Sequence, residues 1–458
     1  MSAPAAIGRD HAGLRLTFGH ALLTSVALLS SGALVYAAVH LGAHAPARQH
    51  LQLGTAAPFF GRRRHLIEFA PLWPAALLGI AIVGAAPLAR RLPWLLLLGS
   101  AWAFAAAWAV LLAASSSWRA VAAPLTTTTE YRAALPSVAN PAQFVHGFVT
   151  NLHLYPTQVK GHPPLPLIVL WSLERIGLHG PGWSAALVIA VGTSAVVAVA
   201  ITIRCVAGAD VARRAMPFLV LAPGTAWIAT SMDGLFAGVV AWGVALVAVA
   251  RIQRSTRRVV AIGAAGGVLV GCVPYLSYGL LPTAALVVMT LLLPVDQWTA
   301  GLRPPHVRHR RLWVIGGLAI GVGAVVVAFT ADGFWWPDGV RATHHFYAHN
   351  YGSGSRPYGY FLLADLAVFI LMIGPATVAG VTHLNVRRNP AGWLVIAALI
   401  AIAISDLSGY MRGEVERIWL PYAPWVVIAA AALTRRRGWL LLQVAVALAV
   451  QGLVVSPW

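Results

Sequence analysis

Charged side chains are scarce in this sequence, and their scarcity excludes an ordinary soluble domain. They make up 10% of the 458 residues, whereas hydrophobic residues make up 59% and the mean hydropathy is +0.76. Soluble globular chains carry roughly 25% charged residues. Runs of about 20 apolar residues, the length that crosses a bilayer, recur from end to end. We therefore predict an all-α polytopic membrane protein.

Cysteine, lysine and nucleotide-binding motifs are also scarce. Cys205 and Cys272 are the two cysteines of the chain, and the predicted topology puts them at opposite membrane faces, which excludes a disulfide framework. No glycine-rich phosphate loop follows a strand-like segment, so nothing indicates a soluble nucleotide substrate. The net charge of +19 comes from short arginine clusters between apolar runs. That pattern is typical of membrane loops and not of a nucleic-acid-binding surface, so no nucleic-acid partner is expected.

Hydropathy predicts about thirteen transmembrane helices. The candidate spans are 17–40, 69–88, 93–114, 184–204, 215–231, 233–250, 259–275, 279–294, 313–330, 359–381, 391–408, 417–433 and 438–456. Arginine concentrates in alternate connections, which predicts a plasma-membrane protein with a cytoplasmic N-terminus. Arg62, Arg63 and Arg64 conflict with this arrangement because they fall outside, so the orientation of the first two spans stays open.

The acids fall mainly on the predicted external side, although they were not used to orient the chain. All five glutamates are predicted to be external: Glu68, Glu130, Glu174, Glu414 and Glu416. Asp10, Asp210 and Asp296 are the acids predicted to be cytoplasmic. Carboxylates near lipid are costly and often functional. The external face, with long loops at 115–183 and 331–358 that are expected to carry short amphipathic helices, is therefore where we expect any chemistry.

The first long loop contains a candidate base and a candidate phosphate ligand. Glu130 follows four threonines and lies close to a membrane exit, where a carboxylate can accept a proton from a hydroxyl group. The alternative is a solvated or helix-capping glutamate. Lys160 and His162 precede Pro163-Pro164, which fixes the backbone before an amphipathic stretch. Lys160 suits a phosphate, and its alternative is an interfacial lysine that extends its amine to water.

These residues carry a family resemblance. An acid and a tyrosine early in the first large external loop, followed by a tyrosine and then His162-Pro163-Pro164-Leu165, resemble the GT-C glycosyltransferases. The closest group contains the protein O-mannosyltransferase-like and aminoarabinose-transferase-like enzymes. A third element, Ala222-Pro223-Gly224 followed by the stretch 230–235 around Asp233, looks like that family's helix break. The resemblance covers residues 93–250 well and the remainder by general pattern only.

The sequence departs from the family pattern in two ways. The family often shows a pair of acids in the first loop, whereas Glu130 stands alone after its threonines. Its first loop usually follows the first span, whereas two further spans precede it here. We therefore divide the chain into N-terminal additional spans (1–92), a GT-C-like catalytic module with the first external loop (93–294), and a C-terminal transmembrane module with the second external loop (295–458).

Two further external segments supply candidate ligands. The second long loop contains Trp335, Trp336 and Arg356 among many aromatic residues, which suit a sugar or polyprenyl chain and a phosphate; its alternative is an interfacial aromatic belt. His344, His345 and His349 match no metal-site spacing. The last external turn alternates Arg412, Glu414, Glu416 and Arg417, which forms either a clamp for a phosphate and a sugar or a mutually neutralised ion cluster.

The resemblance implies an inverting glycosyltransferase that uses a polyprenyl-phosphate sugar donor and a glycan, lipid or protein acceptor of the cell envelope. It implies Glu130 as catalytic base. The candidate donor-phosphate ligands are Lys160, His162, Arg132, Arg356, Arg412 and Arg417, and the candidate sugar or acceptor ligands are Tyr131, Asp233, Trp335, Trp336, Glu414 and Glu416. No metal ligand is assigned, and the cofactor requirement is open. The alternatives are a transporter or flippase of lipid-linked or small solutes, or a non-catalytic scaffold.

Overall fold

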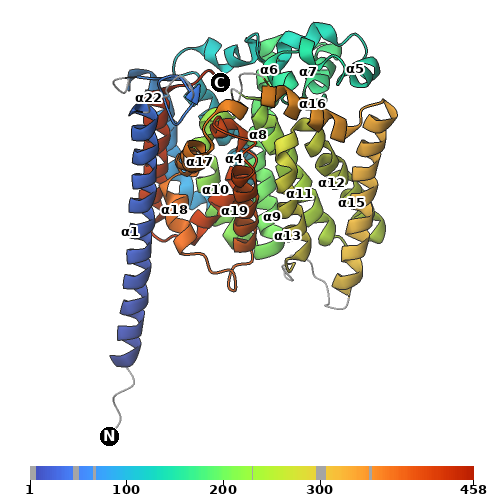
Figure 1. Ribbon diagram of the computed structural model, residues 1–458. Coiled ribbons are helices and arrows are strands. Elements are labelled where there is room, and N and C mark those ends of the chain that lie inside the picture. The colour runs from blue at the N-terminus through green and yellow to red at the C-terminus, as the bar shows by residue number, and fades with distance from the viewer. Residues whose placement is uncertain (1–6, 45–50, 65–68, 230, 296–305, 350–352) are drawn as a thin grey trace.

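The protein is a bundle of helices with a layer of short helices at one end (Figure 1). The computed structural model describes residues 7–44, 51–64, 69–229, 231–295, 306–349 and 353–458. Glu68 and Asp296, which the sequence places on opposite sides of the membrane, lie outside the described residues. Neither Cys205 nor Cys272 forms a disulfide bond, as predicted.

The helices of the bundle are α1 (Ile7–His44), α3 (Trp73–Ala85), α4 (Trp94–Ala113), α8 (Pro181–Thr193), α9 (Ala195–Ala207), α10 (Ala209–Val220), α11 (Met232–Arg251), α12 (Thr256–Leu276), α13 (Ala284–Leu292), α15 (His306–Ala331), α17 (Tyr358–Ile373), α18 (Pro375–Thr382), α19 (Gly392–Leu407), α21 (Ala423–Val427) and α22 (Arg436–Leu453). Short α-helices in the connections are α5 (Pro141–Gly147), α6 (Thr157–Lys160), α7 (Leu165–Arg175), α16 (Trp336–His349) and α20 (Val415–Ile418). The 3₁₀ turns are η1 (Ala70–Leu72), η2 (Ala86–Arg90), η3 (Trp118–Val121), η4 (Ala123–Thr126), η5 (Tyr131–Ser137), η6 (Leu152–Leu154), η7 (Pro223–Trp227), η8 (Tyr278–Thr283), η9 (Ser353–Ser355) and η10 (Ile428–Ala432).

The expectation of thirteen spans is wrong. The described residues contain seven helices long and apolar enough to cross a membrane, or eight if α17 and α18 count as one bent span. The five predicted spans that fail are 215–231, 279–294, 391–408, 417–433 and 438–456. The first four contain helices shorter than the roughly 20 residues a span requires. In the fifth, two arginines and two glutamines lower the mean hydropathy of α22. A hydropathy profile averages composition along the chain and does not detect that α10 ends at Val220, just before Pro223.

The eighth candidate span is sharply broken. α17 and α18 meet at 97°, and Gly374 between them has a φ of +74°, a conformation that glycine adopts without strain. Gln443 of α22 satisfies the backbone at this break: its Oε1 accepts from the Ala376 N–H at 3.2 Å, and its Nε2 donates to the Ile373 carbonyl at 2.9 Å. Because backbone groups in an apolar environment need partners, this one buried side chain stabilises the bend.

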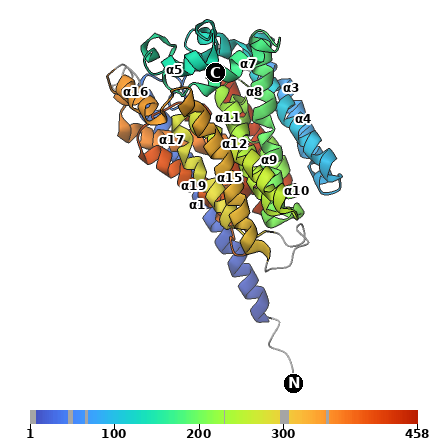
Figure 2. The same cartoon turned by 90° about the vertical axis from the view of Figure 1, so that its right-hand side faces the viewer.

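Both long loops lie at the same end of the bundle, which we call the loop end. The helices α5, α6, α7 and α16 form a layer there, and the described N-terminal part of α1 extends beyond the opposite end (Figures 1 and 2). The sequence predicted this arrangement, since it placed both loops on one side of the membrane. α11 is buried along most of its length, whereas α1 is mostly exposed at the edge of the bundle.

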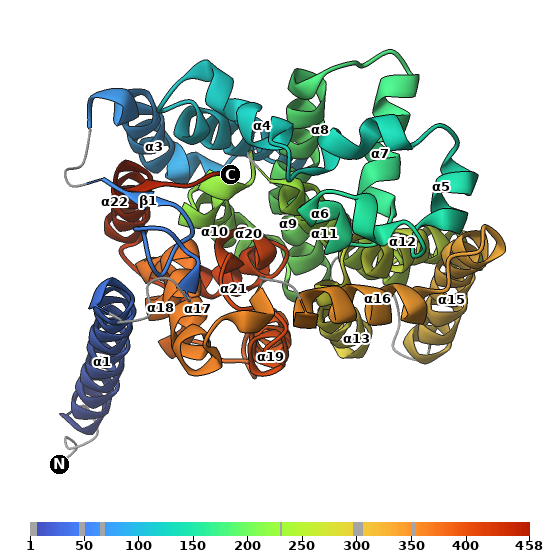
Figure 3. The same ribbon diagram turned by 45° about the horizontal axis from the view of Figure 1, so that its top comes forward.

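A small sheet at the loop end joins the segment that follows α1 to the C-terminal residues. Strand β1 (Arg62–Arg63) pairs antiparallel with β2 (Val454–Val455), with Arg62 opposite Val455 and Arg63 opposite Val454. Seen from the loop end, β1 lies beside the C-terminal residues, while α20 lies close to α11 near the middle of the molecule (Figure 3). The arginines that conflicted with the charge pattern are thus fixed on the same face as the two long loops.

Candidate functional site

A buried network of ion pairs forms the centre of the loop end. Arg417 donates to Asp233 Oδ2 at 2.9 Å and to Glu414 Oε2 at 2.6 Å. Glu414 also accepts from Arg356 at 3.0 Å, so this glutamate bridges two arginines. The side chains of Arg417, Asp233 and Arg356 are each 7% exposed or less. We call these four residues the ion cluster.

Local backbone structure fixes the ion cluster. Ser231 caps α11 by accepting from the Asp233 N–H, and its hydroxyl donates to Asp233 Oδ2 at 2.7 Å, which orients the carboxylate. Glu414 has a φ of +64°, a rarely populated conformation for a residue with a side chain. Gly413 precedes it with its N–H bonded to the Asp365 carboxyl, and a Cβ at Gly413 would lie 2.8 Å from Phe361. The turn therefore requires glycine at this position.

Glu130 of the first long loop is electrostatically coupled to the ion cluster. It occupies the position before η5, yet its side chain makes no capping hydrogen bond, so the helix-capping alternative is wrong. Burial raises the pKa of Glu130 to about 7, with Asp233 and Glu414 raising it further and Arg417 opposing them. A carboxyl group with this pKa is half ionised near neutral pH, which suits a general base.

His162 and Tyr131 line the same region. The His162 ring packs 5.5 Å from Tyr131 and 6.0 Å from Phe236, and its Nδ1 lies 2.8 Å from the Gln158 carbonyl oxygen. Burial lowers the pKa of His162, in opposition to the charge of Asp233. The imidazole is therefore neutral near pH 7, so it offers hydrogen bonds to a ligand and no positive charge.

Tyr347 of α16 belongs to this region although sequence reasoning did not select it. Burial raises its pKa to about 12, and the charges of Glu414, Arg417 and Arg356 all act on it. A Cβ at Gly161 would lie 2.6 Å from the Tyr347 hydroxyl, which shows how closely the two long loops approach. The one sequence signal for Tyr347 was the aromatic run of the second loop, and that run favoured several other aromatic residues equally.

Lys160 lies at the junction of the two loops. Its carbonyl oxygen accepts from the Thr343 hydroxyl at 3.0 Å, and its Nζ lies 4.9 Å from the centre of the Phe346 ring. The amine is partly exposed and makes no ion pair among the described residues. This placement leaves a donor-phosphate role open and also fits the interfacial alternative.

Of four further predicted ligands, three hydrogen-bond to other parts of the chain and the fourth is exposed. Arg132 bonds to Ser184 at 2.6 Å and to Glu174 at 2.8 Å, which ties the first loop to α8. Arg412 donates to the carbonyls of Gly409, Gly354 and Arg356, so its hydrogen bonds hold a turn. Trp336 donates to the Pro274 carbonyl at 2.8 Å, and Trp335 is 53% exposed.

Glu416 is fully buried beside the ion cluster. Its Oε1 accepts from the Phe60 N–H and from the Trp458 indole, each at 3.3 Å, and burial raises the pKa of Glu416 to about 7. Trp458 also lies over the Arg417 guanidinium at 4.5 Å. Trp458 and Phe60 were not selected from the sequence, because no local pattern connects residues so far apart.

Two cavities adjoin this region. One, about 270 Å³, lies between η4 and the C-terminal strand. The other, about 570 Å³, is an apolar groove between α1 and α17 that includes Leu34, Leu41 and Leu363 and ends at Pro357, the neighbour of Arg356. Within the part of the chain that is described, no group of three or more His, Cys, Asp or Glu side chains is arranged to hold a metal ion.

The architecture defines a class: an all-α protein with the helices of a multi-pass membrane protein and a buried charged site under its loop layer. Comparison with known proteins takes the identification no further. No family model, no curated protein and no solved structure matches this chain.

Proposed function

We propose that this protein is an inverting glycosyltransferase that moves a sugar from a polyprenyl-phosphate donor to an acceptor hydroxyl group at the external membrane face. The observation that carries the proposal is the Glu130 carboxyl, whose pKa is raised to about 7 beside Arg417. A base and a cation in one buried site match the two needs of the reaction, since the acceptor must lose a proton and the leaving phosphate gains charge.

In the proposed reaction, the Glu130 carboxylate accepts the proton of the acceptor hydroxyl. The acceptor oxygen then forms a bond to the anomeric carbon, and the bond from that carbon to the phosphate oxygen breaks. The polyprenyl phosphate leaves with the bonding electron pair, and the sugar is transferred with inversion. Arg417 and Arg356 stabilise the phosphate, while His162 and Tyr131 position the donor.

The arginines retain unused hydrogen-bonding capacity. Within the described structure, the buried Nε–H groups of Arg356 and Arg417 have no hydrogen-bond partner. An unsatisfied buried donor costs on the order of 1–3 kcal/mol, so an anion that accepts from both would be favoured. The phosphate competes with Glu414 for these guanidinium groups, which gives the bridging glutamate a part in donor release.

The apolar groove between α1 and α17 supports a lipid-linked donor. It lies between two candidate spans and is lined by Pro357, which follows Arg356 in the chain, so a lipid chain lying in it would have its phosphate close to that arginine. Burial of apolar chain contributes roughly 0.8 kcal/mol per CH₂ group. The orientation deduced from arginine distribution, with the N-terminus in the cytoplasm of a plasma-membrane protein, would put this groove and the ion cluster at the external face.

A transporter is the second candidate, and the 97° bend between α17 and α18 is the observation that favours it. Broken helices form substrate sites in many transporters. Here, however, Gln443 occupies the hydrogen-bonding groups of the break, and the ion cluster lies elsewhere. The transporter hypothesis gives no role to the ion cluster, whereas the glycosyltransferase proposal does.

Glu130→Gln tests the proposal, with Glu174→Gln as the matched control from the same loop. Both proteins are purified and reconstituted into liposomes that contain a panel of polyprenyl-phosphate sugars. Sugar transfer and lipid translocation are then both measured. We expect Glu130→Gln to lower transfer at least about 100-fold and Glu174→Gln to change it less than about threefold. Full transfer by Glu130→Gln would refute the assignment, and translocation without transfer by the unmodified protein would establish the transporter.

A further inference from the structure

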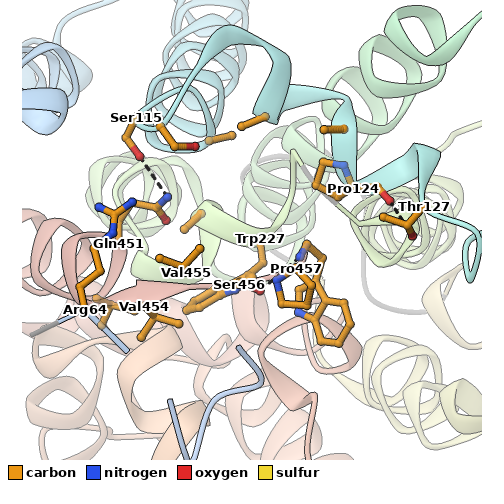
Figure 4. A pocket seen from close by; sticks show the side chains of 17 residues that line it. Arg64, Ser115, Pro124, Thr127, Trp227, Gln451, Val454, Val455, Ser456 and Pro457 are labelled. Atoms are coloured by element: carbon orange, nitrogen blue, oxygen red, sulfur yellow. Dashed lines mark hydrogen bonds between the residues drawn. The ribbon is translucent and has the colours of Figure 1, made fainter. Parts of the chain in front are cut away.

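The cavity of about 270 Å³ differs in its lining from the apolar groove between α1 and α17. It lies under η4, with Ser115, Pro124 and Thr127 on one wall and the C-terminal residues on the other, and the Trp227 side chain extends into the region between them (Figure 4). Gln451 donates to the Ser115 hydroxyl at 3.2 Å across one end. The cavity thus joins the first long loop to the end of α22.

The lining combines alanine, valine and proline side chains with aromatic and neutral polar groups, and carries few charges. Trp227 and Trp458 supply two indole rings, and Ser115, Ser116, Thr127 and Gln451 supply neutral hydrogen-bonding groups. Among the described residues that line the cavity, Arg64 is the one with a charge. Indole faces with neutral polar groups around them suit the C–H faces and hydroxyl groups of a sugar ring, and the absence of an acid from this lining disfavours a cationic ligand.

Two walls of the cavity contain residues that contact Glu130 or the ion cluster. The Thr127 carbonyl accepts from the Glu130 N–H at 3.1 Å, so the cavity ends one turn before the proposed base. On the other side, Trp458 lines the cavity while its ring lies over the Arg417 guanidinium at 4.5 Å. Phe60 stacks on Trp458 at 4.8 Å and Glu416 accepts from its indole, so the ring is held from two further directions.

We propose that this cavity binds the acceptor, and that the acceptor is a hydroxyl-rich carbohydrate, neutral or anionic. The inference rests on the proposed glycosyl transfer and specifies its acceptor class. A volume of about 270 Å³ accommodates about one sugar ring, near the lower end of ordinary ligand sites. Trp458 then has two roles, because it forms a wall for the acceptor and covers the arginine that stabilises the donor phosphate.

The two cavities divide the substrates by polarity. Ser115, Thr127 and Gln451 hydrogen-bond within the protein, and a lipid chain against them would displace water from their remaining hydrogen-bonding sites, so the apolar groove beside α1 offers a better site for a lipid chain. A basic peptide acceptor would meet Arg64 without an opposing acid in the cavity. A carbohydrate can hydrogen-bond to the polar groups and pack against the indole walls, although the Trp458 ring also contacts Phe60 and Arg417.

The test measures binding separately from catalysis. Ser116 lines the cavity and is exposed, so Ser116→Cys is labelled with a maleimide in a Cys272→Ala background, with Cys205 buried. Protection from labelling is measured with neutral di- and trisaccharides of hexoses and pentoses, with matched uronate-containing and amino-sugar versions, a basic peptide and a polyprenyl phosphate. The same series is repeated in Glu130→Gln, which blocks transfer and keeps the cavity.

We expect at least one neutral or uronate saccharide to slow labelling about tenfold, in Glu130→Gln as well, and the amino-sugar version to protect less. Trp458→Ala should abolish protection, while Trp183→Ala, which removes an exposed indole of α8 outside the cavity, should retain it. Protection by the peptide or lipid alone, or by none of the probes, overturns the proposal. Saccharide protection with full transfer in Glu130→Gln would instead refute the proposed catalytic role and leave the binding site standing.

Discussion

The arginines at the two ends of the bundle have different partners. At the end opposite the long loops, Arg251 donates to the carbonyls of Thr290 and Leu293, and Arg213 donates to those of Ala89 and Leu92. At the loop end, Arg132, Arg356 and Arg417 all pair with carboxylates. Both groups are guanidinium ions near helix ends, so the difference lies in what surrounds them.

The carbonyl-bound arginines stabilise the bundle. The last carbonyls of a helix lack intrahelical partners, and a nearby arginine satisfies them and interacts favourably with the helix dipole. The arginines of the ion cluster instead pair with the carboxylates of Asp233 and Glu414, and their charges act on Glu130, whose pKa is raised. Arg412 lies at the loop end but binds carbonyls, so the comparison places it with the structural group.

The largest effect is expected from Arg417, because it is the cation whose charge acts on the pKa of Glu130. Arg417→Gln should reduce transfer per folded molecule by about 100- to 1000-fold, the usual result of removing one charge-stabilising donor. Arg417→Lys should recover part of that loss. The measurement is single-turnover transfer in liposomes, normalised to folded protein by size-exclusion chromatography; retained activity in the glutamine variant would place the phosphate elsewhere.

The pH profile is expected to follow Glu130. With a pKa of about 7, the carboxyl is protonated below that pH and cannot accept a proton, so kcat/KM should fall about tenfold per pH unit below 7 and level off above it. Asp233 raises the pKa of Glu130, so Asp233→Asn should move the midpoint to lower pH. A profile that is flat from pH 5 to 8, measured at saturating donor, would contradict Glu130 as base.

Arg251→Gln tests the opposite end. It removes the hydrogen bonds to the Thr290 and Leu293 carbonyls and leaves buried acceptors unsatisfied, at a cost of about 1–3 kcal/mol in the free energy of unfolding. Thermal unfolding in detergent should show this loss, while transfer per folded molecule stays unchanged. A specific loss of turnover without destabilisation would break the division between structural and functional arginines.

The smallest effect is expected from Arg132, although it also pairs with a carboxylate. Arg132 and Glu174 remain 15% and 28% exposed, and such partly solvated pairs contribute about 1 kcal/mol or less. Arg132→Gln should lower stability by no more than that and change turnover less than about threefold. An effect as large as that of Arg417→Gln would show that carboxylate pairing, and not burial, identifies the site.

Particular residues show what was readable in the sequence. Glu130 was selectable because it is an isolated acid beside a membrane exit, and Arg356, Glu414 and Arg417 because charges are rare in this chain. Arg132, Arg412 and Trp336 were also selected; the structure shows that they hydrogen-bond to other segments, and their role as ligands stays a prediction. Their partners, Ser184, Gly354 and Pro274, lie in other segments, and a local pattern carries no information about them.

The sequence by itself determined that this is a helical membrane protein with both long loops and most of its acids at one end, because hydrophobicity and arginine distribution act locally along the chain. Tertiary structure alone decided the number of spanning helices, since it depends on where the backbone breaks. It also decided the site: Asp233 and Arg417 form an ion pair across 184 residues of sequence, with Glu130 coupled to both. Those charges meet because the packing of α11, α20 and the first loop excludes water from one point, and that burial gives Glu130 its raised pKa.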